Sequence, residues 1–156
     1  MIDPRAYSTE VLPATAPLPY ISRRALQTIR YPAPIPTRCN CCQSPEVELV
    51  EHSAIYGGRS YGDWPYAYLC LSCRAYVGLH PQTDIPLGTL ADKPLREARK
   101  TCKKPFDALW QGGAMSRTQA YKWLAGQMGI SVKQCHFALF TIEQCNQARA
   151  LCERKQ

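Results

Sequence analysis

Two pairs of cysteines, each with the spacing C-x-x-C, constrain the fold of this chain more than any other feature. Cys39 and Cys42 form the first pair, Cys70 and Cys73 form the second, and 27 residues lie between the pairs. Four cysteines with this spacing are typical of a tetrahedral zinc site that is closed by protein thiolates. We therefore expect one structural Zn2+ ion rather than a catalytic one. The alternative, four buried free cysteines, explains the paired spacing poorly.

A third thiol inside the first pair, that of Cys41, leaves the choice of ligands open at this position. A pair made by Cys39 and Cys41 would be an unusual C-x-C arrangement, so Cys39 and Cys42 are the expected ligands. The spacing alone does not decide whether Cys41 replaces one of them.

The cysteines also indicate a cellular compartment. The chain has nine of them, and an odd number argues against a fully paired disulfide framework. The N-terminal sequence Met-Ile-Asp-Pro-Arg lacks the basic flank and apolar run of a secretory signal. No apolar stretch approaches the length of a membrane span. We therefore expect a cytoplasmic protein with reduced thiols and no membrane partner, in which C-x-x-C spacing favours metal binding.

Proline and charge divide the 156 residues into three expected parts. These are a proline-rich N-terminal arm at residues 1–37, a zinc-ribbon module at 38–91 and a helical domain at 92–156. The arm is basic, the module is acidic, and residues 90–156 carry a net charge of +7. A basic C-terminal half favours an acidic partner, which is either nucleic acid or an acidic protein surface.

The arm contains seven prolines, which prevent a long helix or a central strand. Residues 22–30 are free of proline, and Ser22 can cap a short helix there. We interpret the arm as a tail that drapes over the domain or is disordered. A partner-binding arm is the alternative.

The middle segment predicts short strands at 47–51, 54–56, 66–69 and 75–79, with a hairpin loop at 59–65. A cysteine knuckle, a hairpin, a second knuckle and a further strand follow one another in the order of a zinc ribbon. With the helical segments that come after it, this order predicts an α+β protein: a small zinc-ribbon β-hairpin module followed by a compact helical C-terminal half.

Helix signals dominate after residue 92. Asp92 can cap a first helix with Pro94 in its first turn, and we expect Pro105 to break or kink this helix near Lys104. Capping boxes with Gln at the third following position open three more helical segments, after Ser116, Ser131 and Thr141.

Several runs do not follow from generic ribbon geometry. They are Cys73-Arg-Ala-Tyr-Val-Gly-Leu-His80, Pro86-Leu-Gly-Thr-Leu-Ala-Asp92, Leu95-Arg96, Phe106-Asp-Ala-Leu-Trp110, Ser116-Arg117, Ala120-Tyr-Lys-Trp-Leu-Ala125, Gly129-Ile130 and Cys135-His136. Together with the two cysteine pairs, they resemble the phage-associated zinc-finger-containing domain family over about residues 38–146. The resemblance implies zinc binding and a bacteriophage or prophage setting in a bacterial host cell, and it implies no known reaction. Cys41 and Pro105 depart from the family's pattern.

Basic residues form the best candidate for a binding surface. Five of them recur at helical spacing and would line one broad face: Arg96, Arg99, Lys100, Lys103 and Lys104. Arg117 and Lys122 lie in the next expected helix, and basic residues interleaved with aromatic ones can bind phosphates and stack on bases. The alternative is a solvated helix face, and we expect Trp110, Tyr121 and Trp123 to belong to the core because they fall within an apolar helical pattern.

The remaining cysteines, with a histidine, could form a second metal site: Cys102, Cys135, His136, Cys145 and Cys152. Cys145 and Cys152 would lie about two turns apart on one helix, which is too far for a shared ion. We therefore interpret these thiols as small buried hydrophobic groups, although spacing alone leaves a second metal open.

No catalytic motif accompanies the histidines. A metal-dependent nuclease needs a histidine base, a carboxylate and an open metal position, and only Asp84 and Asp92 lie near His80 in the sequence. We therefore name no catalytic residue and expect a non-enzymatic protein. The leading hypothesis is a phage-type zinc protein that binds nucleic acid through the basic helical face. The second is a protein that binds and modulates a host protein, such as a polymerase or a defence effector, and a nuclease is third.

Overall fold

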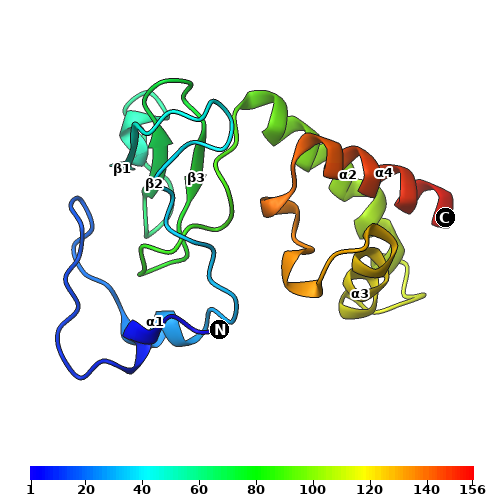
Figure 1. Ribbon diagram of the computed structural model, residues 1–156, viewed down its shortest axis with the longest axis horizontal. Coiled ribbons are helices and arrows are strands. Elements are labelled where there is room, and N and C mark those ends of the chain that lie inside the picture. The colour runs from blue at the N-terminus through cyan, green and yellow to red at the C-terminus, as the bar shows by residue number, and fades with distance from the viewer. The chain divides into compact units, whose positions relative to one another are not determined.

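The computed structural model describes residues 1–156 and divides into two compact units, Met1–Asp92 and Lys93–Gln156. The first unit contains a three-stranded sheet with short helical segments, and the second unit is helical (Figure 1). The expected α+β class is confirmed, because the sheet, the cluster of four cysteines near it and the helical C-terminal half are all present.

The sheet consists of β1 (Val47–Glu51), β2 (Tyr66–Cys70) and β3 (Tyr76–Gly78), all antiparallel and in that spatial order. Because β2 is the central strand, it has neighbours on both edges, and its last four residues are buried. The register pairs Val47 with Cys70. This pairing brings the end of β2, which carries a cysteine, next to the segment that follows the first cysteine pair.

The strand expected at 54–56 is wrong. A 3-10 turn, η2 (His52–Ala54), follows β1 directly, and the chain then loops back to β2. β2 begins opposite Glu51, so residues beyond Glu51 have no strand with which to pair. Gly57 and Gly58, with φ of 61° and 85°, then turn the chain in a conformation that suits glycine.

The proline-rich arm packs onto the sheet unit. It contains η1 (Pro4–Tyr7) and α1 (Arg23–Gln27), and Ser22 caps α1 as expected, because its hydroxyl accepts a hydrogen bond from the amide of Ala25 at 3.2 Å. Apolar side chains of the arm are buried in the same core as β2 and β3: Ala6, Leu18, Ile21, Leu26 and Ile29. The arm therefore contributes part of the apolar core that stabilises the sheet.

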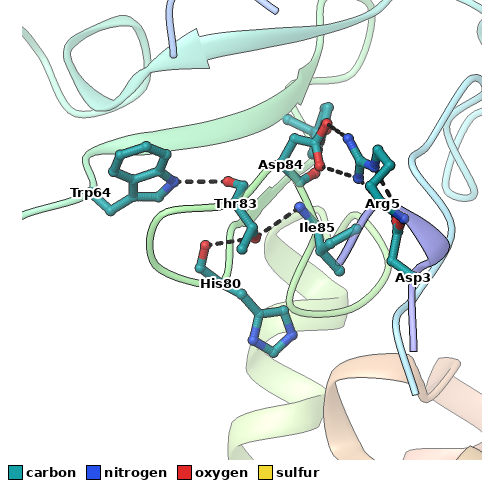
Figure 2. A network of polar contacts seen from close by, with 8 residues as sticks. Asp3, Arg5, Trp64, His80, Thr83, Asp84 and Ile85 are labelled. Carbon is teal, nitrogen blue, oxygen red and sulfur yellow. Dashed lines mark hydrogen bonds and ion pairs between the residues drawn. The ribbon is translucent and has the colours of Figure 1, made fainter. Parts of the chain in front are cut away.

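A network of polar contacts joins the beginning of the arm to the loop after β3 (Figure 2). Both nitrogens of the Arg5 fork donate to the carboxylate of Asp84, at 2.9 and 2.8 Å, and Arg5 also pairs with Asp3 at 3.0 Å. The hydroxyl of Tyr68 donates to the backbone carbonyl of Asp84 at 2.6 Å. The carboxylate of Asp84, which is almost buried, is thus paired by Arg5, a residue far away in the sequence.

The helical unit contains α2 (Lys93–Gln111), α3 (Arg117–Met128) and α4 (Ile142–Lys155), with the 3-10 turns η3 (Val132–Gln134) and η4 (Phe137–Leu139) between the last two helices. Its core consists of small and aromatic side chains that come from all of these helices and the segments between them: Cys102, Phe106, Leu109, Ala120, Leu124, Ala125, Cys135, Phe137, Phe140, Cys145, Ala148 and Cys152. The four cysteines in this set are buried, as expected for small hydrophobic groups.

Of the break or kink expected near Lys104, the break is wrong, because α2 continues through Pro105 to Gln111. A proline inside a helix removes one hydrogen bond and leaves the carbonyl four residues earlier unpaired, at a cost of about 3 kcal/mol. That carbonyl belongs to Thr101, an exposed residue, so water can reach it. Phe106 and Leu109 are buried beyond the proline, and their burial at about 1.5–3 kcal/mol each offsets this cost.

The expected capping boxes are confirmed. At Ser116 and at Thr141 the hydroxyl accepts the amide of the third following residue, while the side chain of that glutamine accepts the amide of the cap residue. At Ser131 the side chain of Gln134 accepts the amide of the cap residue at 3.3 Å. These local contacts fix where α3, η3 and α4 begin.

Candidate functional site

Four thiols of the sheet unit lie close together. The sulfur atoms of Cys39, Cys42, Cys70 and Cys73 are all within 4.8 Å of one another, and two cross-pair distances, Cys39–Cys73 and Cys42–Cys70, are 3.6 Å. A disulfide would require about 2.05 Å. Four sulfurs around Zn2+ at about 2.3 Å lie about 3.8 Å apart if the geometry is tetrahedral. The donor set therefore fits a zinc ion that is held by four thiolates.

The two cysteine pairs have the same backbone geometry. In the first knuckle the amide of Gln43 donates to the carbonyl of Cys39, and in the second the amide of Arg74 donates to the carbonyl of Cys70, at 2.8 and 2.9 Å. Gln43 and Arg74 both have positive φ, 67° and 69°. This left-handed residue closes each turn, and no glycine marks it in the sequence, so sequence reasoning missed it.

Backbone amides also point at the sulfurs from inside the knuckles. The amide of Cys41 donates to the sulfur of Cys39 at 3.3 Å, and the amide of Cys73 donates to the sulfur of Cys70 at 3.5 Å. Such donors stabilise a thiolate, which is the form that binds zinc. The knuckles are thus built to hold negatively charged sulfur.

The ionisation of the thiols is mutually dependent. Burial raises the pKa of Cys70, but the amides of Cys73 and Ser72 and the neighbouring thiols lower it more, so it ends at about 7. Burial and the neighbouring thiols raise the pKa of Cys73 to about 12. The first thiolate therefore disfavours the next, and a divalent cation supplies the charge that lets all four ionise together.

Cys41 lies outside the cluster of four. Its thiol points to the carbonyl of Leu90 at 3.6 Å, and burial raises its pKa. The side chain of Asn40 donates to the same carbonyl at 2.8 Å. The structure therefore groups Cys39 with Cys42 and gives Cys41 a different contact, on the segment that precedes α2.

A family model that is described as a zinc-finger-containing domain matches residues 35–155 of the chain. The chain belongs to this family. The match takes in the four clustered cysteines and nearly all of the helical unit. No curated protein and no solved structure matches the chain.

Family and geometry together define the metal centre of this zinc-finger-containing domain as one structural zinc site. Four protein thiolates fill all positions of a tetrahedral ion and leave none for a substrate or a reactive water. When bound, the ion would crosslink the two knuckles that flank the sheet. Such sites supply folding free energy to small domains.

The basic residues named from the sequence lie in the helical unit. At about 100° per residue, α2 places six cationic side chains within an arc of about 140°, which we call the basic face of α2: Lys93, Arg96, Arg99, Lys100, Lys103 and Lys104. The buried residues Leu95, Cys102, Phe106 and Leu109 lie on the adjoining side of the helix, centred about 120° from the basic face. Lys93, at the first position of α2, was not among the predicted residues.

The members of the basic face differ in their surroundings. Lys100, Lys103 and Lys104 are exposed and form no ion pair. Arg99 is half-buried at the edge of the face, and its Nε donates to the carbonyl of Phe140 at 3.0 Å. Arg99 therefore also holds the segment that leads into α4.

Arg117 and Lys122 point in different directions. The guanidinium of Arg117 lies 5.9 Å from the ring centre of Trp110 and 5.3 Å from that of Tyr121. Lys122 follows Arg117 by five residues, so it lies about 140° around α3. The structure thus joins Arg117 to the end of α2 and leaves Lys122 apart from it.

The aromatic residues expected in the core are only half-buried. Trp110, Tyr121 and Trp123 pack against the core from its border rather than inside it. Lys155 lies over Trp123 at 5.4 Å, as Arg117 lies over the other two rings. Cationic side chains therefore cover rings that the apolar pattern assigned to the interior.

His80 and Asp84, which were considered for catalysis, do not converge. Figure 2 shows the ring of His80 directed away from Asp84, whose carboxylate is bound by Arg5. Burial lowers the pKa of His80. Separately, none of the helices combines the length and the hydropathy that crossing a bilayer requires.

Proposed function

We propose that this zinc-finger-containing domain binds nucleic acid through the basic face of α2. The observation that carries the proposal is the distribution of charge between the two units. Lys93–Gln156 contains twelve lysines and arginines against four acidic residues, a net charge of +8, whereas Met1–Asp92 has a net charge of −1. Four thiolates with one Zn2+ would make the first unit more negative by two charges.

The arrangement of these charges favours a polyanion as the partner. The basic face spans Lys93 to Lys104, about 16 Å along the helix axis. Three of its lysines have no carboxylate partner to leave when a phosphate binds. Phosphate contacts of this kind supply most of the affinity in binding that is independent of sequence.

The zinc site favours a structural role for the sheet unit. Because all four ligands are thiolates of the protein, the ion lacks an open position for catalysis. We therefore assign the sheet unit the role of a metal-stabilised scaffold and propose that the protein is not an enzyme.

Fluorescence anisotropy with labelled single-stranded and duplex DNA tests the proposal. Affinity should fall with salt by about 0.7 to 0.9 logarithmic units per phosphate contact for each tenfold rise in salt. Four to six contacts then predict a loss of roughly 50- to 2,000-fold between 50 and 200 mM salt. Failure to bind any DNA or RNA at 50 mM salt would refute the proposal.

A pair of charge-reversal variants locates the surface. K100E/K103E changes two exposed lysines of the basic face, and K122E/K133E changes two exposed lysines of the same unit that lie outside α2. Both variants alter the net charge equally. We expect the first to reduce affinity at least tenfold more than the second, for all sequences alike. An equal loss in both would mean that net charge alone, and not the basic face, drives binding.

If nucleic acid does not bind, the same face remains available to an acidic surface of a host protein. A pull-down from a bacterial lysate, with K100E/K103E as the control, tests that function.

We also propose a phage or prophage setting and a cytoplasmic location in the host. The support is the resemblance of the sequence motifs, and the neighbourhood of the gene is the test.

A further inference from the structure

We infer that the nucleic acid is single-stranded, and that one of its bases stacks on a platform formed by Trp110, Arg117 and Tyr121. This inference rests on the proposed function, because it concerns the form of nucleic acid that the same surface binds. It starts from the contact of one exposed guanidinium with two half-buried rings.

Contacts with neighbouring side chains of the helical unit hold each part of the platform in place. The indole nitrogen of Trp110 donates to the carboxylate of Asp107 at 3.1 Å, which fixes the ring on α2. The ring of Tyr121 packs on the buried ring of Phe106, with centres 4.6 Å apart. The guanidinium of Arg117 rests on both rings and forms no ion pair. A planar cation that is already ordered loses little conformational entropy when a second flat group stacks on it.

The platform continues the basic face of α2. Arg96, Lys103 and Trp110 follow one another at intervals of seven residues, so they lie within about 40° of one another around the helix and span about 21 Å. A strand whose phosphates follow the lysines therefore reaches the platform at the C-terminal end of α2. At 3.4 Å per phosphate this length corresponds to about six phosphates, and to fewer in an extended strand.

Stacking on the platform selects single strands. Inside a duplex both faces of a base are covered by its neighbours, so neither a ring nor a guanidinium can stack on it. In single strands the bases are free to stack on aromatic side chains and on arginine planes. Phosphate contacts alone would not distinguish the two forms, because duplex and single strand both carry them. The platform is the feature of this surface that does.

The variant R117K tests the inference, because lysine keeps the charge but lacks the flat guanidinium. R149K is the matched control, since Arg149 is an exposed arginine on α4 that pairs with Glu153. The probes are a 12-nucleotide oligo(dT), an abasic strand with the same phosphates, and a 12-base-pair duplex, all at one salt concentration. Thermal unfolding verifies that both variants remain folded.

We expect the unmodified protein to bind oligo(dT) about tenfold more tightly than the abasic strand, and R117K to lose that preference. The affinity of R117K for the abasic strand and for the duplex should remain within about twofold of the unmodified protein, and R149K should change nothing. Equal binding of oligo(dT) and the abasic strand by the unmodified protein, or an R117K that keeps the preference, overturns the inference and leaves the proposed function standing. Absence of binding to all three probes overturns both.

Discussion

The ion pair between Arg5 and Asp84 should be the main polar contribution that holds the N-terminal arm on the sheet unit. The side chain of Asp84 is 7% exposed and that of Arg5 is 32% exposed. Replacing Arg5 by alanine removes both hydrogen bonds of the fork and leaves a carboxylate buried without a cation. The variant R5A tests this contribution.

The magnitude follows from the burial of the two partners. Breaking a fully buried ion pair costs about 3–5 kcal/mol, because the remaining charge is uncompensated. Here the arginine is partly exposed, so water can enter once it is removed, and two hydrogen bonds to a charged group are lost. We therefore expect R5A to lower the free energy of unfolding by about 2–3 kcal/mol. In a unit of this size that loss lowers Tm by about 10–20 °C.

The indole N–H of Trp64 provides a probe for this unit alone, because it donates to the carbonyl of Thr83 at 2.9 Å, one residue from Asp84. Its NMR resonance can be followed through a urea titration in zinc-saturating buffer. R24A is the matched control, since Arg24 is exposed on α1 and forms no ion pair. We expect R24A to change stability by less than about 0.5 kcal/mol.

Adding D84N to R5A should restore part of the loss, because the neutral amide removes the uncompensated charge. Equal urea midpoints for R5A and R24A would refute the reasoning. They would mean that apolar contacts such as those of Leu18, Ile21 and Leu26 hold the arm without help from the ion pair.

Two further predictions concern the metal centre and a half-buried histidine. Replacing Cys70 by serine should remove the bound zinc and unfold the sheet unit, because the site loses one of four ligands and its free energy of binding contributes to folding. Metal analysis and circular dichroism measure these effects, and the control C41S should retain one zinc per chain. A C70S protein with full zinc content and full stability would contradict the assignment. Burial lowers the pKa of His80, so its ring should titrate below 6.5 in an NMR pH series. When the pKa of a histidine is lower in the folded state, the unfolded state binds the proton more readily. The contribution of His80 to the free energy of unfolding is therefore fully present above about pH 6.5 and is lost as the pH falls from about 6.5 to the pKa of the folded state. A ring that titrates at or above about pH 6.5 would contradict this prediction.

Local signals made much of the fold predictable. The spacing of the cysteines indicated the zinc ligands, and the hydroxyl and glutamine of each capping box fixed the starts of α3 and α4, because these contacts involve residues at most three apart. The partial alternation of apolar residues indicated β1, and the apolar and aromatic run that leads into Cys70 indicated β2.

Contacts between distant residues explain what the sequence could not predict. Arg5 and Asp84 are 79 residues apart, so nothing near either one indicates the pairing that joins the arm to the sheet unit. Pro105 predicts a break from its own chemistry, but the burial of Phe106 by residues from α3, η4 and α4 outweighs that local preference. The surroundings of Trp110 also depend on another element, because the guanidinium that lies over its ring belongs to Arg117 of α3.

The run Pro86-Leu-Gly-Thr-Leu-Ala-Asp92 now has a structural explanation. Pro86 bridges to Leu79, the amide of Leu87 donates to the carbonyl of Gly78 at 2.9 Å, and Ala91 bridges to Tyr76, so the run lies along the free edge of β3. The carbonyl of Leu90 accepts from Asn40 in the first knuckle. The run therefore covers a sheet edge that would otherwise expose unpaired backbone groups, and it ties that edge to the zinc site. Its residues are accounted for by the fold, which leaves the basic face of α2 and the platform at its end as the surface where activity should be sought.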